Sequence, residues 1–401
     1  MKSKKRLAIV NQRYGLEVNG GSERYTRALA EHLEKYYDIE VITTCALNYD
    51  TWENYYCKGE EKINGITVRR FPVKRERKME RFRWAFWLVI RFPFFKRITE
   101  EIWLKEQGPY VPKLVEYIKK NQRNYDGFIF VTYLYYPIVK ALPWVGEKSI
   151  LIPTAHDESY IRYGIYKKVF QFSRGILYLT EEEKTFVEGL FDTSMKPNKV
   201  IAMGIEENME CSSSFYTKQG IGYPYVIYAG RIEEGKKCDE LFSYFCRYKK
   251  ENENALKLIL IGKAIMEIPK EEDIIYLGFL QEDEKNSMIR NARALIMPSV
   301  HESLSIAVLE AMQLKVPVLV NGVSEVLKAH CINSKGGLFY YSYDEFKRGL
   351  DFYVKYSDEY MIMKENASKY VREKYNWEEV EQELVDYINN ILERKKDEDN
   401  T

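Results

Sequence analysis

Short apolar runs alternate with helical patterns along the whole chain, and this alternation constrains the fold more than any other feature. A first set of runs covers residues 7–10, 39–44, 66–71, 128–131, 150–153 and 176–179. A second set covers residues 225–229, 256–261, 274–277, 295–297 and 316–320. Apolar strands separated by helices are typical of parallel sheets with both faces covered. The sequence therefore predicts an α/β fold with two doubly wound, Rossmann-like domains.

A linker-like stretch between residues 203 and 222, rich in serine and glycine, separates the two sets. We therefore expect an N-terminal domain over residues 1–203 and a C-terminal domain over residues 204–375. Residues 377–394 form a long amphipathic pattern that predicts a last helix, so residues 376–401 are a third segment of helix and polar tail. The length of 401 residues suits two domains of about 100–200 residues each.

The net charge of +1 is unevenly spread. Residues 1–200 carry 35 Lys and Arg against 25 Asp and Glu (net +10), and the rest carries 26 against 35 (net −9). Residues 74–97 hold nine Lys and Arg against two Glu, with aromatic residues among them: Trp84, Phe86, Trp87, Phe92, Phe94 and Phe95. Such a mixture is typical of segments at an anionic membrane surface. A helix docked on its own domain is the alternative, and no nucleic-acid-binding motif accompanies the segment.

Cysteine usage and hydropathy bear on location. The six cysteines form no C-x-x-C pair, which favours free thiols in a reducing cytoplasm. The apolar run of residues 7–10 is too short for a signal-peptide core, and no stretch reaches the roughly 18 apolar residues that span a bilayer. We expect a cytoplasmic protein, or one attached to the inner face of the membrane without crossing it.

Gly20 and Gly21 follow the first predicted strand and precede a helix that Ser22 is expected to cap and that runs to about residue 36. Glycines at such a place let the backbone approach a ligand, and a helix N-terminus offers N–H donors to an anion. A plain tight turn explains the two glycines equally well, because the dinucleotide fingerprint G-x-G-x-x-G is absent.

His156 lies in residues 154–157, at the end of another predicted strand. Ligands of open parallel sheets bind beyond the carboxyl ends of the strands, so His156 is a candidate for chemistry. A structural hydrogen-bonding role is the alternative. His32 and His330 fall inside helical patterns and are interpreted as incidental.

Gly230 and Arg231 are expected to end the first strand of the C-terminal domain, and Lys236 to begin its first helix. A guanidinium and an ammonium together at the carboxyl end of a strand suit a diphosphate. A solvated surface pair is the alternative.

Glu302 and Glu310 flank the start of a helix expected near Leu304. Glu310 has apolar neighbours inside that helix and needs a partner. The helical rise sets Glu310 roughly 9 Å along the axis from the helix start. The two carboxylates would then contact different parts of one extended ligand, and the helix N-terminus between them can receive a phosphate.

Together these motifs resemble family 4 of the retaining glycosyltransferases, which have the GT-B architecture. The matching elements occur in the family's order: Gly20-Gly21, residues 154–157, Gly230-Arg231 with Lys236, and the E-x7-E signature from Glu302 to Glu310. The resemblance implies two Rossmann-like domains that face a central cleft. It also implies that the C-terminal helix returns to the N-terminal domain.

The resemblance implies a nucleotide diphosphate sugar as the donor, with no cofactor beyond this co-substrate. Arg231, Lys236 and the N–H groups near Ser305 and Ile306 would stabilise the leaving diphosphate. Retention would arise from same-face attack, because no carboxylate is placed as a nucleophile. The only Asp-x-Asp lies in the tail at residues 397–399, so a bound metal is not expected.

The resemblance also implies roles for three side chains. Glu310 would hold the ribose hydroxyls, Glu302 would contact the transferred sugar, and His156 would bind a sugar hydroxyl or a donor phosphate. Three glycines would line the donor site: Gly20, Gly21 and Gly230. The acceptor would be a glycan or a lipid-linked glycan, as in bacterial cell-surface polysaccharide synthesis.

Two other readings stay open at this point. One is another GT-B enzyme, such as a sugar-nucleotide epimerase, and the other is an inactive scaffold at a membrane surface. A glycoside hydrolase would need Glu302 and Glu310 to flank one bond, which a loop and a helix interior do not offer. The chain departs from the family at two glycine-rich places: it reads Ser303-Leu304-Ser305 after the first glutamate, and Gly262-Lys263-Ala264 after the second strand of the C-terminal domain. These departures leave the donor sugar and base open.

Overall fold

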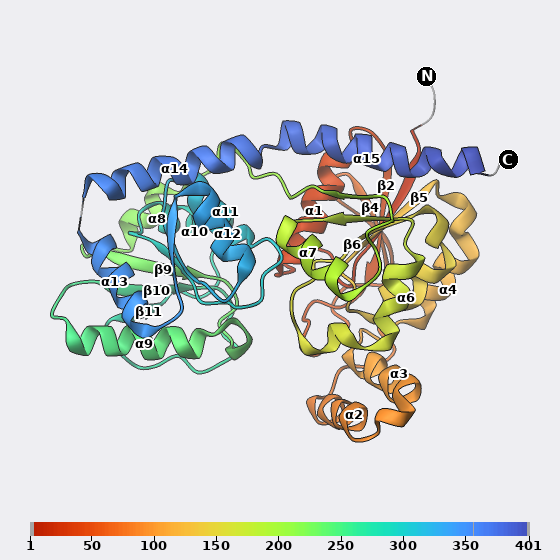
Figure 1. Ribbon diagram of the computed structural model, residues 1–401, viewed down its shortest axis with the longest axis horizontal. Helices are drawn as coiled ribbons and strands as arrows, with labels where there is room; N and C mark the ends of the chain where they lie inside the picture. The colour runs from red at the N-terminus through yellow and green to blue at the C-terminus, as the bar shows by residue number, and fades with distance from the viewer. Residues whose placement is uncertain (1–3, 356, 399–401) are drawn as a thin grey trace. The chain divides into compact units, whose positions relative to one another are not determined.

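The computed structural model describes residues 4–355 and 357–398, and it divides into two compact α/β units (Figure 1). Unit 1 takes in the chain up to residue 203 together with residues 380–401, and unit 2 comprises residues 204–379. Each unit is built on one sheet of mainly parallel strands, as the alternation of apolar runs and helices predicts.

The last helix, α15 (Trp377–Glu398), belongs to unit 1 from Val380 onward. Its Tyr387 hydroxyl donates a hydrogen bond to the backbone carbonyl of Ile176 at 2.9 Å. The return of the C-terminal helix to the N-terminal part of the chain is therefore confirmed. The helix runs four residues further than its predicted end at residue 394, and Asp399 of the Asp-x-Asp pair lies outside the described residues.

Unit 1 contains an eight-stranded sheet in the order β3-β4-β2-β1-β5-β6-β7-β8. All neighbouring strands are parallel except β3, which pairs antiparallel with β4. The strands are β1 Arg6–Val10, β2 Asp38–Thr44, β3 Gly59–Ile63, β4 Ile66–Phe71, β5 Gly127–Val131, β6 Ser149–Ile152, β7 Gly175–Tyr178 and β8 Asn198–Val200. The helices are α1 Gly21–Leu33, α2 Met79–Arg91, α3 Lys96–Gln107, α4 Pro112–Asn121, α5 Tyr136–Ala141, α6 Gly164–Phe172 and α7 Glu181–Leu190.

Unit 2 contains a six-stranded parallel sheet in the order β11-β10-β9-β12-β13-β14. The strands are β9 Tyr225–Ala229, β10 Lys257–Ile261, β11 Ile274–Tyr276, β12 Leu295–Met297, β13 Val318–Asn321 and β14 Gly337–Tyr340. The helices are α8 Ser213–Lys218, α9 Cys238–Glu251, α10 Glu282–Arg290, α11 Ile306–Gln313, α12 Glu325–Ser334, α13 Tyr343–Val354 and α14 Asp358–Lys374. Helix α8, capped by the Ser212 hydroxyl, occupies part of the stretch predicted to be a linker.

The prediction that Ser22 caps the first helix is wrong. Helix α1 begins at Gly21, its N-cap is Gly20 at φ 153°, and it ends at Leu33. A Cβ at Gly20 would lie 2.1 Å from Oε2 of Glu23, so only glycine fits there. Helix α7 does have a side-chain cap, because the Thr180 hydroxyl accepts the hydrogen bond of the Glu183 N–H in its first turn.

Each sheet reverses its winding at one point, between β1 and β5 in unit 1 and between β9 and β12 in unit 2. Ligands of doubly wound folds bind outside the carboxyl ends of the strands at such a switch point. Gly20 and Gly21 follow β1, Gly230 follows β9, and Glu302 lies in the loop after β12. The topology therefore places predicted site residues at the switch point of each unit.

The described helices include none that is both long and apolar enough to cross a bilayer. All six cysteines are free thiols, and three of them are buried: Cys45, Cys238 and Cys331. Large rings fill the core of unit 1, where Trp103 packs edge-on against Tyr166, and Tyr166 packs edge-on against Tyr133.

Candidate active site

The turn after β9 carries the first predicted cation of unit 2. β9 ends at Ala229, so Gly230 and Arg231 lie in the turn beyond the strand rather than at its end as predicted. The Arg231 carbonyl accepts a hydrogen bond from the Tyr228 hydroxyl at 2.6 Å. The Arg231 guanidinium lies 3.3 Å from a carboxylate oxygen of Glu233. The backbone of Arg231 is therefore held by a residue of β9, and its side chain by a residue of the same turn.

Lys236, the second predicted cation, does not begin a helix as predicted. It ends the 3-10 turn Glu234–Lys236, and α9 starts at Cys238 after Lys237 has turned the backbone to a left-handed φ of 58°. The Lys236 Nζ atom lies 2.7 Å from Oε1 of Glu302. Their side chains are only 24% and 13% exposed. The structure thus brings together a cation and a carboxylate that the sequence predicted separately.

Helix α11 begins at Ile306, two residues later than predicted, because Ser305 adopts a left-handed φ of 64°. Ser305 is the N-cap residue, and its side chain makes no cap hydrogen bond. The first turn therefore presents backbone N–H groups to the loop that carries Glu302, with the positive end of the helix dipole behind them. Glu310 lies roughly 6 Å from this helix start, not the predicted 9 Å.

Glu310 is buried, with 2% of the residue exposed. Its partner is Lys285 on α10, whose Nζ lies 3.0 Å from Oε2 of Glu310 and 2.7 Å from Oε2 of Glu282. A buried carboxylate needs such a partner, as predicted, because an unpaired charge in the interior is strongly unfavourable. Sequence reasoning missed Lys285, since an acidic residue three positions before a lysine is an ordinary pattern of a solvated helix.

His330 on α12 holds the loop that leads into α11. Its Nε2 lies 2.7 Å from the Leu304 carbonyl, and its Nδ1 lies 3.1 Å from the Tyr370 hydroxyl. A carbonyl only accepts, so Nε2 carries the proton and Nδ1 accepts from the tyrosine. Burial lowers the pKa of His330 to about 4. The interpretation of His330 as incidental missed this contact, because a helical pattern does not show which loop a helix faces.

The depressed pKa makes stability depend on pH. The unfolded chain takes up the proton near pH 6.5 and the folded chain only near pH 4, so stability falls as pH drops through this window. We expect His330→Gln, which retains an N–H donor, to remove about 2 kcal/mol of the loss between neutral pH and about pH 5. Urea unfolding of both proteins at the two pH values measures the difference. Parallel losses in the two proteins would contradict this account.

In unit 1, His156 lies in the loop after β6, where Thr154 has a left-handed φ of 49°. The His156 Nδ1 atom is 3.9 Å from Oε1 of Glu158. That carboxylate also accepts a hydrogen bond from the Tyr133 hydroxyl at 2.6 Å. Burial raises the pKa of Glu158 to about 7, although the tyrosine works against the shift. Sequence reasoning missed Glu158. Its only signal was a carboxylate two residues after a histidine at a strand end.

The Glu183 carboxylate anchors the same loop by hydrogen bonds to backbone N–H groups. Its two carboxylate oxygens accept hydrogen bonds from the backbone N–H of Ala155 at 2.5 Å and of Leu179 at 2.7 Å. Burial raises the pKa of Glu183 to about 8, and the two backbone hydrogen bonds oppose this rise. The residue before His156 is therefore tied to the end of β7.

The loop with Gly20 and Gly21 is fixed by a buried ion pair between Arg13 and Glu23. Arg13 also donates to the Asn19 carbonyl at 2.9 Å. Burial opposes ionisation of Glu23, but Arg13 and neighbouring hydrogen bonds outweigh it and lower the pKa of the carboxyl. A Cβ at Gly21 would meet no described atom within 4 Å, so packing places no demand on this glycine.

Comparison with known proteins identifies the C-terminal part of the chain. Residues 217–370 match the family described as Glycosyl transferases group 1. An uncharacterized glycosyltransferase of Methanocaldococcus jannaschii is 26% identical and covers 97% of this chain and 99% of its own length.

Solved structures extend the likeness to the whole chain. Sucrose-phosphate synthase of Thermosynechococcus elongatus superimposes with a TM-score of 0.70 at 13% identity, over 98% of this chain and 100% of that one. The Anabaena protein HepE, solved in complex with UDP-glucose, gives a TM-score of 0.71 at 13% identity, over 96% and 99%. The predicted GT-B fold is therefore confirmed, and the residues that match the family model lie within unit 2. The described residues include no cluster of three or more His, Cys, Asp or Glu side chains that could hold a metal.

Proposed function

We propose that the chain is a family 4 retaining glycosyltransferase that moves a sugar from a nucleotide diphosphate sugar to a glycan or lipid-linked acceptor. The observation that carries the proposal is the ion pair between Lys236 and Glu302 at the switch point of unit 2. Cleavage of the bond from sugar to phosphate develops negative charge on the leaving diphosphate. A fixed ammonium at a largely buried position is suited to stabilise that charge.

Each cation of this site is already paired with a carboxylate, Arg231 with Glu233 and Lys236 with Glu302. Glu302 holds the Lys236 ammonium in place before the donor binds. A diphosphate carries more charge than one carboxylate, so we expect the ammonium to pair with the diphosphate once the donor is bound. The Glu302 carboxylate is then free to accept hydrogen bonds from the transferred sugar. The N–H groups at Ser305 and Ile306 add donors for a phosphate oxygen.

In the proposal Glu310 accepts hydrogen bonds from the ribose hydroxyls, and Lys285 holds the Glu310 carboxylate in place. The acceptor hydroxyl attacks from the face that the leaving group occupies, and a leaving phosphate oxygen takes its proton. The two fixed cations Arg231 and Lys236 do the electrostatic work that a metal does in other transferases, so we propose a metal-independent reaction.

Unit 1 supplies the remaining roles of the proposal. His156 binds a sugar hydroxyl or a donor phosphate, and Gly20 and Gly21 let the backbone approach the donor. Open space around Gly21 supports a ligand role for this glycine over a packing role. A cytoplasmic location completes the proposal and rests on the cysteine usage. A part in cell-surface polysaccharide synthesis rests on the family resemblance.

A donor screen by thermal shift tests the proposal with UDP, GDP, ADP and their sugars. One nucleotide family should raise the melting temperature, because a ligand at a hundred times its Kd stabilises the folded state by about 2.7 kcal/mol. We expect Glu310→Gln to weaken that nucleotide about 10- to 100-fold through loss of a charge-assisted hydrogen bond.

Glu365→Gln is the matched control for this screen, since Glu365 is an exposed carboxylate of the same unit, paired with Lys315. It should bind the nucleotide as the wild type does. If no nucleotide shifts the wild-type protein, the donor site does not work and the inactive scaffold becomes the better account. If both variants weaken binding equally, Glu310 does not contact the ribose.

A further inference from the structure

Residues 79–98, which we call the aromatic tip, form the end of a helical hairpin in unit 1. The tip comprises α2, the 3-10 turn Pro93–Phe95 and the start of α3. In Figure 1 this pair of orange helices projects from one end of unit 1. Eight large apolar side chains of the tip are exposed: Met79, Trp84, Trp87, Ile90, Phe92, Phe94, Phe95 and Ile98.

Helix α2 has two apolar faces. The inner one packs on the core of unit 1 and consists of Phe82, Ala85, Phe86 and Val89. The outer one carries Trp84, Trp87 and Ile90, which are 53%, 50% and 64% exposed. The inner face alone accounts for docking of the helix on its own domain. The outer face has no such role within the described chain, and large apolar patches of this kind mark interaction sites.

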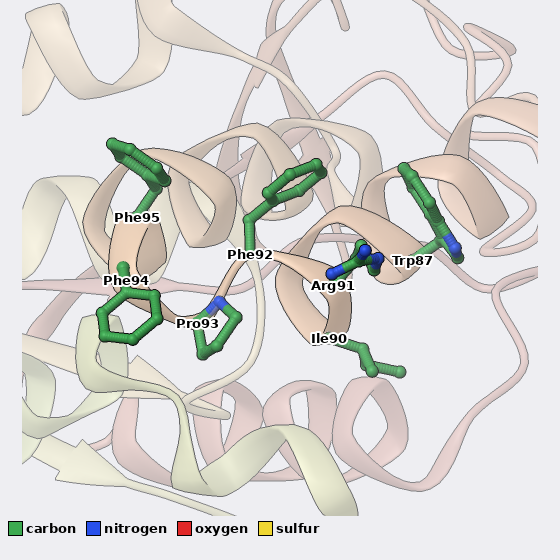
Figure 2. A pocket seen from close by; sticks show the side chains of 7 residues that line it. All are labelled: Trp87, Ile90, Arg91, Phe92, Pro93, Phe94 and Phe95. Atoms are coloured by element: carbon green, nitrogen blue, oxygen red, sulfur yellow. The ribbon is translucent and has the colours of Figure 1, made fainter.

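The turn between the helices extends the outer face. Nine consecutive residues, 90–98, are exposed, and Phe94 at the apex is 96% exposed. Trp87 and residues 90–95 line a hollow of about 490 Å³ (Figure 2). Figure 2 shows the rings of Phe92, Phe94 and Phe95 standing out from the ribbon around it. Exposed aromatic rings at the apex of a turn are suited to insertion into an apolar phase.

Cations surround these rings. Residues 78–98 contain one acid, Glu80, and six exposed cations: Lys78, Arg81, Arg83, Arg91, Lys96 and Arg97. Arg75 and Arg77 of the same basic stretch have internal partners instead, since Arg75 pairs with Glu106 and Arg77 donates to Gln107. Lys74 and Glu76 of this stretch are exposed and opposite in charge, so the net charge that faces outward is that of Lys78 and the tip.

Helix α3, which continues from the tip, packs against the segment that follows His156. Trp103 of α3 stacks on Tyr160, with ring centroids 5.3 Å apart. Glu100 of α3 accepts a hydrogen bond from the backbone N–H of Ile165 at 3.0 Å. Tyr160 and Ile165 both lie in the segment that follows His156. Helix α3 therefore connects the tip to the carboxyl edge of the sheet in unit 1.

We propose that the aromatic tip docks unit 1 on an anionic lipid bilayer. The exposed rings of the tip enter the boundary between headgroups and acyl chains, and the six cations lie against lipid phosphates. These rings are Trp84, Trp87, Phe92, Phe94 and Phe95. Charge complementarity selects this occupant, because a face with six cations and one acid repels a second copy of itself. For the proposed glycosyltransferase, and resting on that proposed function, docking favours the lipid-linked acceptor over a free glycan.

Co-sedimentation of the full chain with vesicles tests the docking. We expect binding to vesicles of phosphatidylcholine mixed with phosphatidylglycerol and little binding to phosphatidylcholine alone. The variant Trp87→Ser/Phe94→Ser should bind about 100-fold more weakly, at about tenfold for each exposed ring. The variant Arg91→Glu/Lys96→Glu/Arg97→Glu should lose at least about 100-fold, at about fivefold or more for each cation.

The matched control, Lys218→Glu/Lys250→Glu/Lys270→Glu, makes the same change in net charge at exposed lysines of unit 2. It should bind the mixed vesicles as the wild type does. All substituted side chains are exposed, so the melting temperatures should agree, and the nucleotide-induced shift should persist in every variant. That shift separates failure of docking from failure of the proposed donor site.

Several outcomes would overturn the proposal. One is no binding of the wild type to mixed vesicles. Another is an equal loss in the control, which would show that only overall charge matters. A third is a concentration-dependent dimer in sedimentation velocity that Trp87→Ser/Phe94→Ser abolishes, because the rings would then be covered by a second copy. Binding to nucleic acid that competes with the vesicles would also replace the bilayer as the partner.

Discussion

Replacing Lys236 by methionine is expected to lower the rate of sugar transfer about 1000-fold while the protein stays folded. The Lys236 ammonium lies 2.7 Å from Glu302, at the place where the proposal puts the leaving diphosphate. Methionine has a similar length but no charge, so the diphosphate loses its neutralising partner as the bond breaks. About 1000-fold corresponds to about 4 kcal/mol of transition-state stabilisation.

Lys237→Met is the matched control, because it removes a neighbouring ammonium from the same turn. If Lys236 acts at a specific place, the control should retain most of its activity. The loss in Lys236→Met should fall on kcat more than on donor affinity, since the charge is largest in the transition state. Activity within tenfold of the wild type would remove Lys236 from the reaction.

Gly262→Ala is expected to destabilise unit 2 by about 4 kcal/mol or more. Gly262 follows β10 with a φ of 129°, which an L side chain rarely adopts. An added Cβ would lie 1.9 Å from the Gly230 carbonyl oxygen, so the backbone of one turn must move. Urea unfolding measures the loss, and the nucleotide-induced thermal shift should weaken as well, because Gly230 leads into Arg231.

Gly278→Ala separates the two causes in this prediction. Gly278 also has a positive φ, of 74°, but an added Cβ there would meet nothing within 4 Å. This variant therefore has the backbone strain without the collision, and we expect it to cost about 1 kcal/mol. Equal losses in the two variants would show that the close approach of Gly262 to Gly230 is not what makes glycine necessary.

The sequence predicts the central strands and the edge strand β11, but it misses the edge strands β3, β8 and β14 for a physical reason. β5 and β9 are buried over their whole length, so each has to be an apolar run. The edge strand β3 is exposed over four of its five residues, and β8 is a short strand of intermediate burial. Their residues are selected by pairing with a neighbouring strand, and a single strand's hydrophobic pattern does not contain that information.

The candidate site, too, could be predicted from the sequence only in part. Lys236 and Glu302 could be predicted as site residues because each lies in a loop that follows the carboxyl end of a predicted strand. Their pairing could not be predicted, since it joins residues 66 positions apart. Lys285 and His330 were missed because each acts from a helix whose own pattern looks ordinary. What they touch is decided by the packing of helices against the sheet.

Three loops of the candidate site each contain a non-glycine residue in the left-handed region: Thr154, Lys237 and Ser305. Such a conformation costs a side-chain-bearing residue about 1 kcal/mol or more relative to glycine. Selection for thermostability alone would therefore favour glycine at these positions. Glycine would make the loops that hold His156, Lys236 and Glu302 more flexible. We therefore expect the most thermostable sequence for this fold to differ from the most active one at these positions. Stabilising substitutions in this protein should leave those three residues unchanged.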